Sequence, residues 1–92
     1  MLNDPFVLQQ ADFWAKRLVA RKDTSVADRI EHMFQIALGR PADKEEREQF
    51  ARAVVKLAEL HEVPTERILS SQIVWHDVAH AMFNLKEFIY IW

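Results

Sequence analysis

The spacing of apolar residues along the chain predicts a protein built of helices. The first periodic stretch begins at Pro5, and its apolar residues stand three or four positions apart, as on one face of an amphipathic helix. Proline is favoured at the first helical position because its missing N–H would have no partner there, and Asp4 before it is a suitable N-cap. The predicted buried face contains Val7, Ala11, Trp14 and Leu18, and it is widened by Phe6, Phe13 and Val19.

A second helix is predicted between Ser25 and Gly39. Ser25, followed three residues later by Asp28, resembles a capping box in which Asp replaces Glu. Gly39, the single glycine of the chain, follows the apolar run and is expected to end the helix in a left-handed conformation. Pro41 cannot continue the helix. The predicted buried residues are Val26, Ile30, Met33, Phe34 and Ala37.

A third helix is predicted after Asp43, which can cap it while Glu46 reaches back to the N–H of the cap. Its predicted buried stripe is Phe50, Val54, Leu57 and His61, and it ends before Pro64.

The last helical region is predicted to open at Thr65, to break with a new cap at Ser70-Ser71, and to end at Asn84. Its predicted apolar face contains Ile68, Leu69, Ile73, Trp75, Val78, Ala79, Met82 and Phe83.

These elements predict an all-α fold, a compact bundle of four main helices with short connections, in one domain over residues 1–92. The scarcity of glycine and proline supports short connections, because long loops are rich in both. The tail from Glu87 to Trp92 is dense in large apolar side chains. So much apolar surface at a terminus either folds back on the bundle or meets a neighbour.

Composition narrows the range of functions. A formal charge of −2 argues against non-specific nucleic-acid binding, so no nucleic-acid partner is expected. Without cysteine the chain has no disulfide, no thiolate metal site and no cysteine nucleophile. Every uninterrupted apolar run is far shorter than the roughly 20 residues that a membrane span needs.

His76 and His80 are the candidate metal ligands. Their i,i+4 spacing places both on one side of a helix, as in HExxH zinc sites, but Asp77 stands where that motif has its second residue. A third ligand would have to come from another helix, from His32 or His61. The pattern favours ordinary structural histidines, and we therefore predict no metal, no cofactor and no catalytic residue.

The corner between the second and third predicted helices is interpreted as a structural clasp made by Gly39, Arg40, Pro41 and Asp43. The planar guanidinium of Arg40 can hold a carboxylate through two hydrogen bonds. Glu87 is its predicted partner, because a carboxylate within an apolar tail needs compensation where it is buried.

Three stretches in this order carry a family resemblance: residues 2–7, residues 29–41 and residues 75–90. Together they resemble the C-terminal end of planctomycete-specific domain 1, also called domain of unknown function 1553, over residues 2–91. The Gly39-Arg40-Pro41 corner and the late Glu87-Phe88 also resemble, more distantly, the helical domain of unknown function 4214.

The first resemblance implies context more than activity. Members are usually large exported proteins of planctomycetes and related bacteria, often with a second planctomycete-specific domain and sometimes a cytochrome c-like domain. The haem motif of such a domain needs cysteine and is absent. The family domain is longer than this chain, so we expect the C-terminal fragment of a larger protein, whose location by the resemblance is the periplasm or the cell surface.

The resulting expectation is a non-enzymatic structural or interaction module at the C-terminus of a large exported multidomain bacterial protein. Its partners would be other domains of the parent protein, or a second copy through the apolar tail. The alternative is a small accessory ligand-binding or metal-binding helical module that uses His76 and His80.

Overall fold

The computed structural model describes residues 5–85. This part of the chain forms four α-helices and one 3-10 helix and contains no strand, so the predicted all-α bundle is confirmed. The elements are α1 (Pro5–Val19), α2 (Val26–Leu38), α3 (Lys44–Leu60), the 3-10 helix η1 (Thr65–Ser70) and α4 (Gln72–Phe83). The predicted cap Asp4 and the apolar tail lie outside the described residues.

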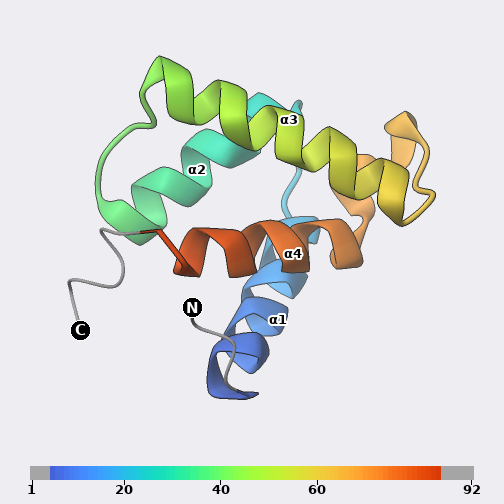
Figure 1. Cartoon of the computed structure of the whole chain (residues 1–92), viewed down its shortest axis with the longest axis horizontal. Helices are drawn as coiled ribbons and strands as arrows, with labels where there is room; N and C mark the ends of the chain where they lie inside the picture. The colour runs from blue at the N-terminus through green and yellow to red at the C-terminus, as the bar shows by residue number, and fades with distance from the viewer. Residues whose placement is uncertain (1–4, 86–92) are drawn as a thin grey trace.

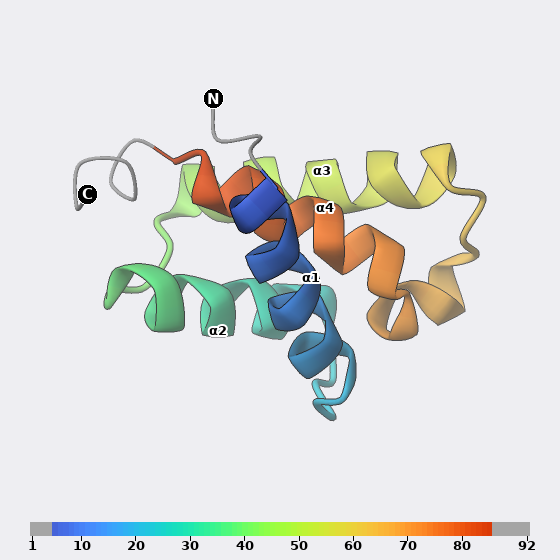
Figure 2. The ribbon, with the colours of Figure 1, turned by 90° about the horizontal axis from the view of Figure 1, so that it is seen from below.

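Helix α4 lies at the centre of the fold. Helix α1 crosses it on one side, and α3 packs against both α4 and α2 (Figures 1 and 2). Ala11 and Ala15 on the inner face of α1 are completely buried, and their small side chains let the backbone of this helix approach its neighbour closely. The crossing of α1 and α4 is the most extensive packing between two helices.

The helix ends follow the polar signals of the sequence. The Ser25 hydroxyl accepts a hydrogen bond from the Asp28 N–H, and Gly39 ends α2 with φ 68° and ψ 21°, the left-handed region. Asp43 and Glu46 form the complete capping box of α3. Ser71 caps α4, so the predicted break at Ser70-Ser71 separates η1 from α4.

The core gathers around Trp75, which is fully buried and donates its indole N–H to the Ile68 carbonyl at 2.8 Å. Phe34 and Phe50 meet edge to face, with their ring centroids 5.3 Å apart. This packing joins α2 to α3 and is of the kind that stabilises aromatic pairs beyond simple burial.

Three predicted core residues are exposed. Phe6 and Phe13 are 58% and 44% exposed, because the inner face of α1 is narrower than predicted and consists of Val7, Ala11, Ala15 and Leu18. Ile73 is 50% exposed, because the first turn of α4 instead directs Val74 inward. The two phenylalanines therefore belong to the surface of α1.

No helix among residues 5–85 has both the length and the apolar character needed to cross a membrane.

Candidate functional site

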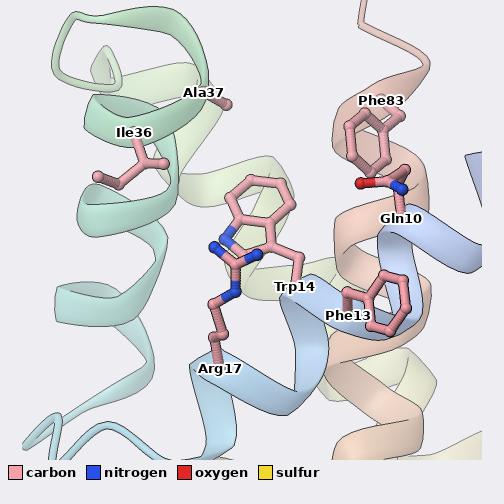
Figure 3. A pocket seen from close by; sticks show the side chains of 7 residues that line it. All are labelled: Gln10, Phe13, Trp14, Arg17, Ile36, Ala37 and Phe83. Atoms are coloured by element: carbon pink, nitrogen blue, oxygen red, sulfur yellow. The ribbon is translucent and has the colours of Figure 1, made fainter.

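An apolar groove lies between α1, α2 and the end of α4. Gln10, Trp14 and Arg17 stand at i, i+4 and i+7 of α1, so they share one side of this helix and form one wall (Figure 3). Ile36 and Ala37 come from α2, and Phe83 comes from α4.

Two aromatic side chains on the walls of the groove are in contact. Trp14 and Phe83 pack with their ring centroids 5.7 Å apart, and the indole projects between α2 and α4 (Figure 3). At the rim, Phe13 and Ile36 are 44% and 64% exposed. The groove therefore offers side chains that can still lose apolar surface to an occupant.

The lining indicates what the groove can hold. Its seven described residues comprise five apolar side chains, the Gln10 amide and the Arg17 guanidinium, without a carboxylate, imidazole or hydroxyl. Its volume of about 260 Å³ is below the roughly 300–1,000 Å³ of typical small-molecule sites. These features suit one or two apolar side chains with a nearby carboxylate, and the lining supplies no general acid or base.

A second feature is the fully buried Arg29, whose exposed fraction is 1%. Its Nε donates to an Asp23 carboxylate oxygen at 2.8 Å, its Nη2 donates to the Arg21 carbonyl at 3.4 Å, and its Nη1 donates to the Leu69 carbonyl. The guanidinium also stacks over the Trp75 ring at 4.9 Å from the centroid. Arg29 thus ties the α1–α2 connection and η1 to the core.

Burial is the largest influence on Asp23 and disfavours its charged form, but the hydrogen bonds and charges of Arg21 and Arg29 outweigh it and lower the pKa of this carboxyl. Sequence reasoning missed this centre. The signal was present, since Arg29 lies three residues after Val26 and four before Met33, within the apolar stripe of α2.

The corner residues of the predicted clasp lie together, except that Glu87 is outside the described residues. Arg40 pairs with Glu46 through two hydrogen bonds of 2.8 Å, and its Nη1 also donates to the Pro41 carbonyl at 3.0 Å. The hydrogen bond from Arg40 is the main cause that lowers the pKa of Glu46 to about 2. The tie between Arg40 and Glu87 stays a prediction.

The candidate metal ligands His76 and His80 lie on α4, and His76 is held by protein groups. Its Nδ1 lies 3.4 Å from an Asp77 oxygen and its Nε2 lies 3.3 Å from the Leu8 carbonyl. His61 reaches the same region from the end of α3, with its Nε2 2.8 Å from the other Asp77 oxygen. Among the described side chains, no three His, Asp or Glu are grouped so that they could hold a metal ion.

Comparison with known proteins gives a family match. A sequence model of the family PSD1, described as protein of unknown function (DUF1553), matches residues 1–54. No curated protein matches the chain, and no solved structure matches it. The match includes the first two stretches of the resemblance and ends before the third, and the similarity to the domain of unknown function 4214 is not shown. Because the matched part is more than half of the sequence, the chain belongs to the PSD1 family of proteins of unknown function (DUF1553).

Proposed function

We propose that this chain is a non-enzymatic module that packs against other domains of a larger protein, using the outer surface of α1. The observation that carries the proposal is the exposure of large apolar side chains on this helix. Phe6 and Phe13, seven positions apart on one face of the helix, are 58% and 44% exposed beside the aromatic groove. An exposed apolar surface of this kind is typical of a protein interface.

Family membership supports the setting of the proposal. The PSD1 family is uncharacterised, and the parent that we propose is a large exported multidomain bacterial protein with this chain at its C-terminus, as the resemblance implies. The helical domain over residues 1–92 is then one structural part of that parent. The apolar, almost uncharged lining of the groove is consistent with a role in packing rather than in catalysis.

Self-association tests the interface. An isolated module whose partner surface is uncovered should associate through it, so the wild-type chain is expected to form dimers or larger species in light scattering at micromolar concentration. Phe6→Glu should shift it towards the monomer, because a carboxylate at this position opposes burial of the surface. Val55→Glu on α3 is the matched control, since Val55 is 52% exposed.

The proposal fails if the wild-type chain is monomeric at every concentration. It also fails if Val55→Glu, and not Phe6→Glu, reduces association, because the interface would then lie on α3. Circular dichroism of both variants confirms that they keep the helical fold, which is expected because both side chains face water.

A further inference from the structure

The groove lies where the described chain ends. Phe83, which forms one wall, is followed by Asn84, the C-cap of α4, and by Leu85. The Leu85 N–H donates to the Met82 carbonyl at 3.0 Å, and the Leu85 side chain packs against the core. The segment that starts at residue 86 therefore begins three residues after a wall of the groove.

The sequence of that segment complements the groove. Residues 88–92 are five consecutive large apolar side chains, three of them aromatic, and an aromatic wall of Trp14 and Phe83 stands nearby. Five such side chains left in water would be unfavourable. Glu87 offers a carboxylate to Arg17, the charged residue of the lining.

The size of the groove and the reach of residues 86–92 are both compatible with this segment as the occupant of the groove. A volume of about 260 Å³ suits one or two side chains. Seven residues, extended at roughly 3.3–3.6 Å each, span at most about 25 Å. Because this reach is shorter than the 36 Å length of the molecule, it favours binding of the segment at surfaces near the end of α4.

We infer that residues 86–92 of this chain fill the groove within the same molecule, with an aromatic side chain against Trp14 and Phe83 and with Glu87 beside Arg17. This inference goes beyond the proposed function and does not depend on it, because Phe6 is not part of the groove lining, although Phe13 borders both the groove and the proposed interface. Of the two expectations for the apolar tail, this inference favours folding back onto the same molecule over contact with a second copy.

Limited proteolysis of the full chain tests the inference. Chymotrypsin cleaves after aromatic residues, so mass spectrometry can follow the loss of the tail at Phe88 and Tyr90. Ile36→Glu places a charge on the groove rim and is expected to accelerate this loss roughly tenfold, because protection of a bound segment follows the stability of its bound state. Leu60→Glu is the matched control and should leave the rate unchanged, since Leu60 is 73% exposed and lies on α3.

A charge exchange tests the predicted orientation. Arg17→Glu should accelerate loss of the tail, and Glu87→Arg in the same chain should restore most of the protection. Equal cleavage rates in wild type, Ile36→Glu and Leu60→Glu would overturn the inference. Protection that increases with protein concentration would also overturn it, because the tail would then bind a second copy. Failure of this test leaves the association measured with Phe6→Glu unaffected, so the two proposals can fail separately.

Discussion

Arg29 is a charged side chain enclosed by the core, and partners from three segments compensate the cost of burying its charge. Asp23 supplies the opposite charge, Leu69 supplies a carbonyl, and Trp75 supplies an aromatic face. Among the described residues, no buried side-chain nitrogen or oxygen lacks a hydrogen-bond partner. A buried charge is tolerated when it is paired and hydrogen-bonded in this way, and removal of one partner leaves the other uncompensated.

Replacement of Arg29 by Met should therefore destabilise the protein by about 3–5 kcal/mol, the usual cost of breaking a buried ion pair. Urea unfolding of Arg29→Met measures this loss. Asp23→Asn added to the variant should recover part of it, because the largely buried Asp23 carboxylate would otherwise keep only the more exposed Arg21 as its charged partner. Arg52→Met is the control, since Arg52 is exposed on α3 and should change the stability by less than about 0.5 kcal/mol. Equal stability of Arg29→Met and Arg52→Met would contradict the assigned role.

Sequence reasoning fails in a consistent way at single residues. Apolar periodicity assigned Phe6 and Phe13 to the core because it measures which residues share a face, and the width of that face depends on the helix packed against it. It overlooked Arg29 because a charged residue in an apolar stripe is usually assigned to the surface. Both errors concern tertiary partners, which a local pattern does not contain.

At the scale of elements, the polar residues at helix ends were sufficient to predict where the helices begin and end. Ser25, Gly39 and Ser71 each end or begin a helix as predicted, because caps satisfy backbone groups within a few residues of themselves. The same locality explains the corner before α3, where Glu46 accepts from the Asp43 N–H at 3.0 Å and also holds Arg40. The groove could not be predicted, because its walls come from three helices far apart in the sequence.

The pairing of Arg40 with Glu46 should appear as energetic coupling across the corner. The variants Arg40→Ala and Glu46→Gln, alone and together, should show a coupling free energy of about 1 kcal/mol, at the upper end for exposed pairs because the contact is bidentate and partly buried. Chemical unfolding of the four proteins measures it. Losses that simply add would show that the pair contributes nothing to stability.

The same cycle with Glu87→Gln in place of Glu46→Gln tests the tie between the corner and the tail that the sequence predicts, which is the alternative to Glu87 lying beside Arg17. A coupling between Arg40 and Glu87 would mean that the guanidinium serves both carboxylates. Additive losses would contradict that tie while leaving the pairing with Glu46 intact.

At the scale of the whole molecule, the pKa shifts found among residues 5–85 share one direction. Hydrogen bonds from the Gln72 amide to Asp12 and from Arg40 to Glu46 are the largest influences that lower the pKa values of these two carboxyls. The arginines beside Asp23 lower its pKa against the effect of burial. Burial, followed by the charge of Arg21, lowers the pKa of His32. The folded state therefore binds fewer protons than the unfolded state wherever these groups titrate.

Acid should consequently destabilise the protein. As the pH falls through 6.5, the ordinary pKa of His32, and then through 4.5, the ordinary pKa of Glu46, protons bind the unfolded chain first. The unfolding free energy from urea titrations should decline from pH 7 to pH 3, most steeply below about pH 4.5. In Glu46→Gln the decline between pH 4.5 and pH 3 should be smaller by about 1 kcal/mol, a value reduced for the partial exposure of this side chain. Glu48→Gln, which removes an exposed carboxylate from the same helix, is the matched control. A Glu46→Gln profile that parallels wild type over this range would show that the bond to Arg40 is not the source of acid sensitivity.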